Sequence, residues 1–522
     1  MLKDLFHFDT GDGGFELAER ESGSPTLFGA WKDVEKKGEE GLRFPETRDG
    51  AYALLSRVFN SEVNTDAILR KFLIGGEIPA LIAYMNGMAD DAKINDFILR
   101  PLMECAVPEA DLSFLSENVI RISEVKKSSD MKSIIRDISG GMTALFVEGE
   151  GSALLLETRG FEKRSVSSPE NEKVVSGPNE SFTEDLRTNV TLIRRELHMK
   201  ELVAEYRTVG ESGTRLAVLY IDGLTDRALV SEVKRRLARI RTGGFVSTGT
   251  IAQMIEDDGY SPLPQILQTE RPDRVSSHIL QGRAAVLVDG SPFALVMPVT
   301  FFSLMNSPED IYLRKPLGSL IRLIRWFGAL VSVLLPGYFL ALALYHQGLL
   351  STEVLSTVIA SRRMVFEPIG VEMLLLLLIF QMIREAGQRV PGNIGQAIGI
   401  IGGLIMGQAA VSAHLASSVV LIIVAASGLG NFCIPDYQTQ LAASYFRIAA
   451  VIAAWLAGLL GITALALLAA CHIAGLRSFG VPFLAPFSPR TSRKAPTILR
   501  GNIGMHSRPD DYVNTSLDGS VK

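Results

Sequence analysis

The chain divides into two parts of unlike composition, and this division limits its possible folds more than any other feature. Up to about Tyr312 charged and apolar residues are mixed, whereas from Leu317 to Leu476 there are long apolar runs such as WFGALVSVLLPGYFLALAL. Runs of this length match the hydrocarbon thickness of a lipid bilayer. We therefore predict a soluble N-terminal part followed by a helical membrane domain in contact with lipid.

The composition limits which cellular compartment and which kinds of partner we expect for this protein. The 522 residues are enough for about three domains, and their net charge is only -5. Because no stripe of Lys and Arg with interleaved aromatic residues occurs, no nucleic-acid partner is expected. Three cysteines fit a reducing compartment. The opening residues MLKDLFHFDTGDGG lack the apolar core of a secretory signal, so the soluble part is predicted to stay cytoplasmic.

A long repeat runs through the soluble part. The pattern Tyr-x2-Gly-x2-Asp-x3-apolar-x2-apolar begins at Tyr84 and again at Tyr220, an offset of 136 residues. Each copy follows an apolar strand pattern, and some tens of residues later each is followed by two apolar runs joined through an acidic residue and a glycine. We predict a duplicated α/β fold from this order of elements.

The acidic residues at those junctions, Glu148 and Asp289, invite two interpretations. They are either carboxylate sites or the tips of plain hairpins. A catalytic carboxylate has no need of a second copy, whereas a hairpin that closes each lobe does, and Asp-Gly is a hairpin signal. We favour the hairpins.

The domain boundaries follow from these patterns. A Ser- and Pro-rich charged stretch separates the two copies, and Ser181 with Glu184 has the spacing of a capping box that begins the next helix. The predicted organisation is an extension at 1–47, a first lobe at 48–161, a linker at 162–180, a second lobe at 181–312, a membrane domain of four or five spans at 313–478, and a polar tail at 479–522.

The sequence TERPDR concentrates polar groups around one proline in the second lobe. Glu270, Arg271, Asp273 and Arg274 are its charged members. Arg271 and Asp273 are possible contacts for an anionic ligand. We favour the alternative that Asp273 caps the following helix, with the arginines pairing locally or contacting a neighbouring subunit.

Four basic residues, Arg314, Lys315, Arg322 and Arg325, precede or begin the first span and predict that this end lies in the cytoplasm. Further spans are expected at 394–414, 415–434 and 448–476, with a weaker apolar segment at 367–385. Five full crossings would leave the C-terminus outside, whereas basic residues in the tail favour the inside. The sequence leaves this choice open.

Polar residues inside the membrane half are candidates for a conduction path. Glu372 and Gln381 flank the weak second segment, and Gln396 and Gln408 share one face of the third span. Such groups are costly against lipid and face a water-filled path or neighbouring helices. We weigh a pore lining evenly against hydrogen bonds between helices. The third span also carries the candidate packing glycines, Gly399, Gly403 and Gly407.

No Ser/His/Asp, phosphate-loop or metal-ligand spacing occurs in the sequence, and the seven histidines are scattered. We therefore expect no enzymatic activity, no cofactor and no metal site. An inverted repeat among the spans, typical of secondary transporters, is not seen either.

The assembled motifs resemble the A subunits of the GerA-type spore germinant receptors, a family that includes the stage V sporulation protein AF. The resemblance extends from about Gly75 to Phe487. Its most specific stretches are FTEDLRTNVTLIRREL, YIDGL, SPLPQILQTERPDRVSSHILQGRAAVLVDGSPFALVMP, SPEDIY, REAGQRVPGNIGQAIGIIGGLIMGQAAV and RSFGVPFLAPF.

This resemblance implies a multi-pass protein of the spore inner membrane whose N-terminal domain faces the core. It implies a transporter-like B subunit and a lipoprotein C subunit as partners. It also implies a homo-oligomeric ring that conducts monovalent cations when a nutrient is sensed. A non-conducting scaffold that relays the signal is the alternative.

Overall fold

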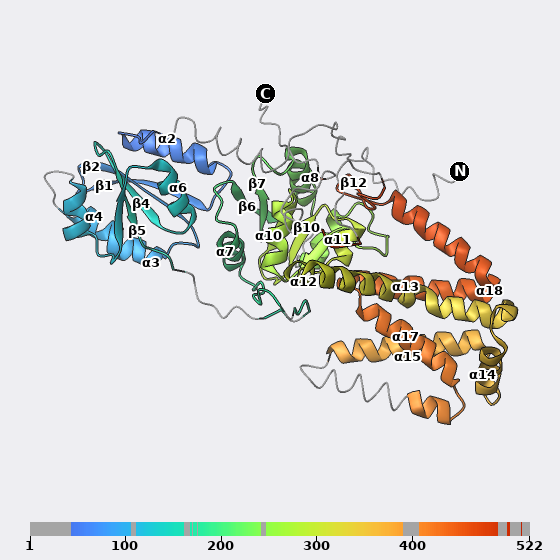
Figure 1. The fold of residues 1–522 in the computed structure, drawn as a ribbon. Coiled ribbons are helices and arrows are strands. Elements are labelled where there is room, and N and C mark those ends of the chain that lie inside the picture. The colour runs from blue at the N-terminus through green and yellow to red at the C-terminus, as the bar shows by residue number, and fades with distance from the viewer. Residues whose placement is uncertain are drawn as a thin grey trace.

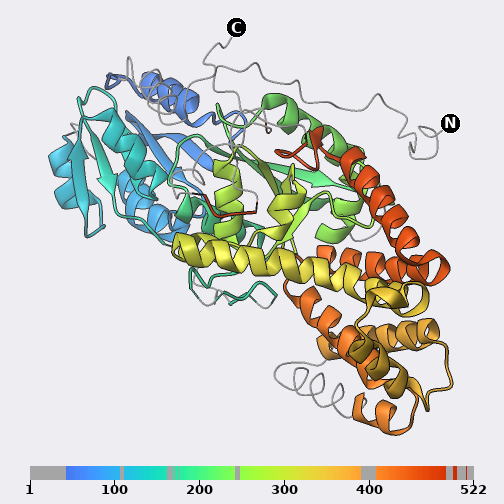
Figure 2. The same ribbon diagram turned by 45° about the vertical axis from the view of Figure 1, so that its right-hand side comes forward.

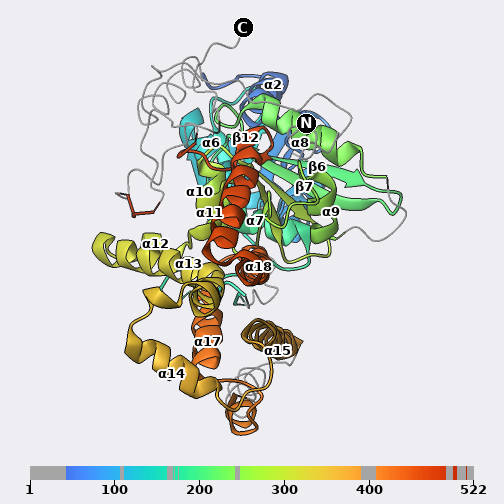
Figure 3. The same cartoon turned by 90° about the vertical axis from the view of Figure 1, so that its right-hand side faces the viewer.

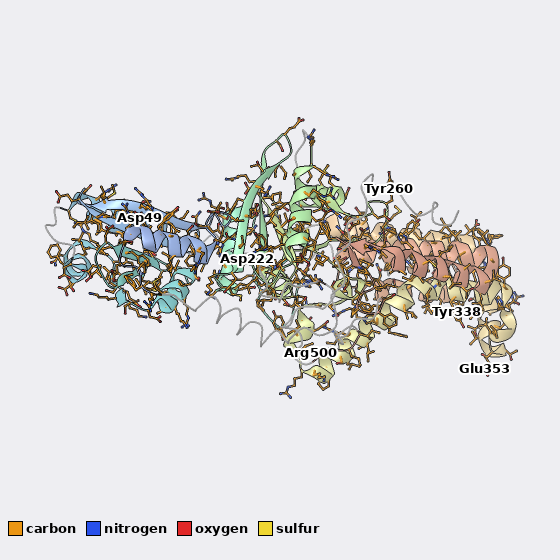
Figure 4. The ribbon with its side chains drawn as sticks, turned by 90° about the horizontal axis from the view of Figure 1, so that it is seen from above. Asp49, Asp222, Tyr260, Tyr338, Glu353 and Arg500 are labelled. Carbon is orange, nitrogen blue, oxygen red and sulfur yellow. The ribbon has the colours of Figure 1, made fainter. Side chains whose placement is uncertain are left out.

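The computed structural model describes residues 43–105, 111–160, 168–169, 171–174, 176–241, 247–389, 407–488, 498–501 and 513. Its parts lie in a row, with two sheet-containing lobes followed by a group of helices (Figure 1). In the view from above, Asp49 lies in the first lobe, Asp222 in the second and Glu353 toward the far end of the helices (Figure 4). The molecule is therefore elongated, and the second lobe is its central part.

The two lobes contain five-stranded sheets of the same topology. The orders are β1-β2-β4-β5-β3 and β6-β7-β9-β10-β8, and every pairing is antiparallel. The strands of the first sheet are β1 (Ala67–Ile74), β2 (Ile78–Met85), β3 (Val125–Ser128), β4 (Thr143–Val147) and β5 (Ala153–Leu156). Those of the second are β6 (Leu202–Val209), β7 (Thr214–Ile221), β8 (Leu267–Thr269), β9 (Ala284–Val288) and β10 (Ala294–Met297).

Helices cover both faces of each sheet, which gives two apolar cores per lobe. In the first lobe these helices are α2 (Arg48–Phe59), α3 (Asp91–Lys93), η1 (Ile94–Leu99), α4 (Arg100–Glu104), α5 (Leu112–Phe114), η2 (Leu115–Val119) and α6 (Met131–Ser139). In the second they are α7 (Leu186–Glu196), α8 (Arg227–Ala238), α9 (Thr248–Ile255) and α10 (Pro272–Leu280), and the short α11 (Phe301–Met305) and α12 (Glu309–Tyr312) lead out of the lobe.

The repeat predicted from the 136-residue offset is confirmed by these matching topologies. Asp90 and Asp226 occupy the same position, because each caps the helix that follows the second strand of its sheet, β2 or β7, and accepts hydrogen bonds from that helix's first amides. Gly87 and Gly223 adopt positive φ angles of +80° and +82° in the turn just before that cap. The repeated residues are therefore turn and cap residues.

The two junction carboxylates lie at hairpin tips, as predicted. Glu148 follows β4 and Asp289 follows β9, and each pair of flanking strands is antiparallel. Asp289 also accepts hydrogen bonds from the half-exposed guanidinium of Arg215 at 2.8 and 3.1 Å, and from the amide of Leu186 at 3.3 Å. It is thus a structural residue at the edge of the second lobe.

The predicted capping box of Ser181 and Glu184 is wrong. The N-cap of α7 is Asp185, whose carboxylate accepts a hydrogen bond from the amide of Thr188 at 2.8 Å. Ser181 instead donates to the carbonyl of Glu270. The carboxylate of Asp185, four residues after Ser181, competed successfully for the helix end, since Asp is as good an N-cap as Ser.

Within the described part of the helical half, two helices are long and apolar enough to cross a membrane, α13 (Lys315–Tyr345) and α18 (Tyr437–Gly475). Shorter elements lie beside them, below α13 and α18 in Figure 3. These are η3 (Gln347–Leu349), α14 (Thr352–Arg362), α15 (Ile369–Arg389) and α17 (Ser418–Phe432). With the lobes, they confirm the predicted fold class of a duplicated α/β part followed by long apolar helices.

α18 is a helical hairpin. Its backbone leaves helical angles at Ala457 and Gly458, and its two limbs both lead back to the second lobe (Figure 2). Ala442 of the first limb and Leu476, just after the second, belong to the same core of that lobe. Each limb is about 25–30 Å long at 1.5 Å per residue. The predicted span at 448–476 contains this break, so it is not one continuous helix.

The two lobes are joined by a buried ion pair. Arg194 of α7 donates to Asp66 at 2.8 Å and to Asn64 at 3.0 Å, and both partners belong to the first lobe. All three side chains are at most 3% exposed. The turn at Gly87 lies in the same interface, where a Cβ would sit 2.5 Å from the hydroxyl of Thr191.

The substitutions Gly87→Ala and Gly223→Ala form a matched pair that tests this interface between the lobes. Both strain a left-handed backbone, which costs about 1–2 kcal/mol. Gly223 faces open space, whereas Gly87 meets Thr191, whose branched side chain has little freedom to turn aside in a helix. We expect the Gly87 variant of the full chain to unfold at a clearly lower temperature than the Gly223 variant, measured by circular dichroism in detergent. Equal losses would contradict this interface.

Candidate functional site: the junction between the second lobe and the apolar helices

A buried carboxylate joins the end of the second lobe to the first apolar helix. Asp310, which is fully buried in α12, accepts hydrogen bonds from Arg322 at 2.9 Å and from Arg325 at 2.8 and 3.0 Å. Arg325 also donates to the carbonyl of Met305 in α11. Two turns of α13 are therefore fixed to the lobe by charge-assisted hydrogen bonds, which are stronger than neutral ones.

Residues near the C-terminus strengthen this connection. Arg500 donates to the carbonyls of Ile311 and Leu313, in and just after α12, and its side chain packs against Gly318 of α13. A Cβ at Gly318 would lie 2.8 Å from the Asp310 carbonyl oxygen. The start of α13 is thus closely enclosed by the end of the lobe.

The TERPDR motif lies beside this junction and holds the linker in place. Arg271 is fully buried and forms a two-point ion pair with Asp273 at 2.7 and 3.0 Å. Its remaining donors reach the carbonyls of Glu172 and Pro178. The Asp273 carboxylate also accepts from the hydroxyl of Tyr312 at 2.7 Å, which connects the motif to the end of α12.

The other two charged residues of the motif act in the same way. Glu270 accepts hydrogen bonds from the amides of Asn171 and Glu172 at 2.6 and 2.8 Å. Arg274 pairs with Glu172 at 3.2 Å and donates to the carbonyl of Asn306. The predicted local pairing is therefore found. The predicted cap is wrong, because the N-cap of α10 is Arg271 and makes no side-chain cap bond.

The end of the helical half returns to the second lobe through β11 (Arg477–Ser478) and β12 (Val481–Pro482). Asp257 accepts from the amide of Phe479 at 2.6 Å and from Arg236, whose guanidinium covers the Phe479 ring. Ser478 bonds the backbone of Gln265 and Val299. Both ends of the helical half are thus attached to one rigid lobe.

Glu256, the residue before Asp257, carries a titratable carboxyl group close to this attachment. Glu256 accepts a hydrogen bond from the amide of Gln265 at 3.2 Å. Burial, together with the neighbouring charges of Asp257 and Asp258, raises the pKa of the Glu256 carboxyl to about 7, although the hydrogen bond from Gln265 acts to lower it.

The structure describes only some of the predicted pore residues. Glu372, in the first turn of α15, is 1% exposed; it pairs with Arg362 at 3.2 Å and accepts from the amide of Ser417 at 2.5 Å. The amide oxygen of Gln381 is buried without a hydrogen-bond partner among the described residues. Gln408 is exposed.

The structure also describes only some of the predicted packing glycines. Gly407 is buried, and a Cβ there would lie 3.3 Å from Leu421 of α17. Gln396, Gly399 and Gly403 fall outside the described residues. Whether these residues line a pore or pack helices together remains a prediction.

Sequence reasoning missed two groups of buried charges. Asp310 enters the sequence analysis only as part of SPEDIY, and its pairing with Arg322 and Arg325 was not predicted. Arg447, which the sequence analysis does not single out, is 1% exposed and lies in the first limb of α18. In the described part of the chain, no group of three or more His, Cys, Asp or Glu is placed to hold a metal ion.

The comparisons with known proteins agree with one another about which proteins this chain is similar to. The model of a family described as Bacillus/Clostridium GerA spore germination protein matches residues 53–511. Spore germination protein A1 of Bacillus subtilis is 35% identical over 433 residues, 81% of this chain and 87% of that protein. The membrane protein YfkQ of the same species is 34% identical over 427 residues, 81% of this chain and 83% of that protein.

One solved structure is also similar. It is the crystal structure of the N-terminal domain of the A subunit of the Bacillus megaterium spore germinant receptor GerK3. It aligns with a TM-score of 0.40 and 26% identity, covering 50% of this chain and 97% of that chain.

Asp310→Asn tests the junction. Removing one member of a buried ion pair costs about 3–5 kcal/mol, because the partner charges stay buried. Asp289→Asn is the matched control, since its pair with Arg215 is largely exposed and such pairs contribute about 0–1 kcal/mol. We expect a large loss of thermal stability for the first variant and little for the second. Similar small losses in both would contradict a structural role for Asp310.

The substitution Glu256→Gln tests the attachment of the C-terminal segment, because Glu256 makes the stability of the folded chain depend on pH. The pKa of Glu256 is raised in the folded chain relative to the unfolded one. Stability from this group is therefore fully present below about pH 4.5 and is lost as the pH rises through about 7. We expect wild type to lose more stability between pH 5 and 8 than Glu256→Gln does, with the exposed Glu353→Gln behaving as wild type. Parallel pH profiles would count against the raised pKa.

Proposed function

Since the chain belongs to the Bacillus/Clostridium GerA spore germination protein family, we propose that it is the A subunit of a nutrient germinant receptor and forms a ligand-gated channel for monovalent cations. The relatives named spore germination proteins support the first part of this proposal. The apolar helices beneath two rigid lobes support the second. The proposed activity is conduction, not catalysis.

The proposed location is the spore inner membrane, with both lobes on the core side. The long apolar helices and the name of the membrane protein YfkQ support a membrane location. The basic residues Arg314 and Lys315 at the start of α13 favour the core side for the lobes. Because residues 477–483 pack against the second lobe, the C-terminal end of the helices lies on that side too.

The observation that carries the gating proposal is the attachment of one lobe to three helix ends. Asp310 fixes the start of α13, Ala442 fixes the first limb of α18, and Phe479 follows the second limb. A displacement of this lobe moves these helix ends together, because packed elements shift as rigid bodies between discrete arrangements. A nutrient signal that reaches the lobe thereby reaches the helices.

The proposed conduction path involves α15 and the segment that follows it. Gln381 presents an amide oxygen without a partner among the described residues, and Gln408 is exposed on the isolated chain. An exposed polar residue beside apolar helices is costly in lipid, and a ring of subunits around a water-filled centre removes that cost. A homo-oligomer therefore fits these positions.

The proposed partners are a transporter-like B subunit that takes the nutrient and a lipoprotein C subunit. A contact through TERPDR is not favoured, because Arg271 is fully buried and its guanidinium bonds the linker carbonyls and Asp273 of its own chain. A non-conducting scaffold is the alternative function, and the test below separates it from a channel.

Replacing Gln396 and Gln408 by Leu is the test. A hydrophobic lining opposes water and ions, so we expect germinant-triggered potassium release from spores to fall at least about tenfold, the effect of a barrier raised by about 1.4 kcal/mol. Gln347→Leu, an exposed glutamine beyond α13, is the control and should release potassium as wild type does. Membrane levels are checked by immunoblot. Normal release from the double variant at normal levels would favour the scaffold.

A further inference from the structure

The far end of α13 lies one bilayer thickness away from the second lobe. Arg325 is held by Asp310 of the lobe, and Tyr345 ends the helix twenty residues later. At 1.5 Å per residue this stretch is about 30 Å long, which equals the hydrocarbon thickness of a bilayer. With the lobe at one membrane surface, as proposed above, Tyr345 reaches the other surface.

The break in α18 lies at the same level. The hydroxyl of Tyr345 donates to the carbonyl of Trp455 at 2.7 Å, just before the non-helical residues Ala457 and Gly458. A Cβ at Gly458 would lie 3.0 Å from the Tyr345 ring. Tyr and Trp concentrate at membrane–water interfaces, because their rings are apolar and their tips polar. The ends of two helices therefore mark the same far surface.

The residues that follow α13 expose large apolar side chains at this end. They form η3, α14 and the turn before α15, and Leu349, Ile359 and Met364 among them are 61–68% exposed. Phe366 is 98% exposed, so almost its whole ring is uncovered. Glu353 of α14 lies at the end of the helices that is farther from the lobes (Figure 4). Apolar exposure of this kind marks a surface for a partner or a membrane.

An ion pair holds these residues against the neighbouring helices. Arg362, at the end of α14, donates to the carboxylate of Glu372 at 3.2 Å and to the carbonyl of Glu367 at 2.7 Å. The Glu372 side chain is fully buried in the first turn of α15. Arg362 thus closes the turn that carries Met364 and Phe366 and ties it to α15, which leaves their side chains on the outside.

We propose that residues 349–367, the far-surface segment, insert their exposed apolar side chains into the lipid leaflet opposite the lobes. This inference rests on the membrane location proposed above. The segment continues the apolar outer faces of α13 and α18, where Leu344 and Leu456 are also exposed, so one lipid phase covers all three. Surface segments of this kind reach about 5–10 Å into the boundary between headgroups and acyl chains. Insertion also sets the height of α15, because Arg362 joins the segment to Glu372.

The charges of the far-surface segment favour lipid in general over anionic lipid in particular. Arg362 and Arg363 are balanced by Glu353 and Glu367. Segments that select anionic lipids carry an excess of Lys and Arg, and this segment has none. Exposed Arg363 has a long apolar stem that allows its guanidinium to reach the headgroups while Met364 stays in the apolar layer. Apolar area therefore drives the insertion.

The test measures the depth of single fluorescent labels on the full chain in phosphatidylcholine vesicles. The three native cysteines are replaced by alanine, and an NBD label is attached to Phe366→Cys, Leu467→Cys or Ser212→Cys. Leu467 lies nine residues beyond Gly458, about 14 Å along the second limb of α18 and so near the bilayer centre. Ser212 lies at the tip of the β6–β7 hairpin, and all three side chains are exposed.

Depth is obtained from quenching by lipid nitroxides at two positions along the acyl chain, and water access from quenching by iodide. We expect the label at residue 366 to lie about 10–15 Å from the bilayer centre, and the label at residue 467 closer to it. Iodide should quench the label at residue 212 at least about threefold more strongly than that at residue 366, because insertion removes the latter from water. Added phosphatidylglycerol should leave these depths unchanged.

Two results at residue 366 would overturn the proposal while residue 467 is quenched by lipid nitroxides. One is iodide quenching equal to that at residue 212. The other is a label shielded from iodide and also out of reach of both nitroxides, because a protein surface would then cover the segment. Absence of lipid quenching at residue 467 would instead contradict the membrane location of the helices, and this proposal with it.

Discussion

The carboxylate of Asp310, enclosed by Arg322 and Arg325, joins two parts of the chain that would otherwise have little reason to move together. One part is a lobe folded around a sheet, and the other is a helix of lipid-compatible composition. A buried ion pair contributes little net stability compared with apolar packing, but it tolerates few geometries. Its value here is orientation, because two turns of α13 are held in one direction relative to the lobe. Everything that follows along the helical half depends on that direction.

The second lobe differs from the first in what surrounds it, although the two share one topology. Its core includes residues from the first limb of α18 and from the segment after the second limb, Ala442 and Phe483 among them, whereas the described cores of the first lobe contain only the lobe's own residues. Duplication thus produced two similar units, of which one became the base for the helices. Among the described residues, the first lobe meets the second lobe at a buried interface that includes Asp66, Asn64 and Arg194. A signal received by the first lobe would reach the helices by way of the second.

Sequence patterns predicted the features that repeat or depend on local chemistry. The offset between Tyr84 and Tyr220 predicted the duplicated topology, and the acidic-glycine junctions predicted the hairpins, because turns and caps are decided by neighbouring residues. Two caps were assigned wrongly, at Ser181 and Asp273, since several capping residues stood within a few positions of each other. The buried pairs of Asp310 and Arg194 were missed for a different reason. Their partners lie 12–15 and 128 residues away, and no local pattern reports such a distance.

The break at Ala457–Gly458 changes how the last apolar run of the chain is interpreted. An apolar run of 29 residues from Ile448 to Leu476 is more than one crossing needs, and a single long span would leave the tail on the far side. With the break, the first limb begins before the predicted span, at Tyr437, and takes in Arg447. The same change that returns the C-terminal segment to the second lobe therefore brings a charged residue into the helical interior. The return of α18 to the second lobe and the burial of Arg447 belong to one arrangement, a helix that reverses so that its two ends contact the same lobe.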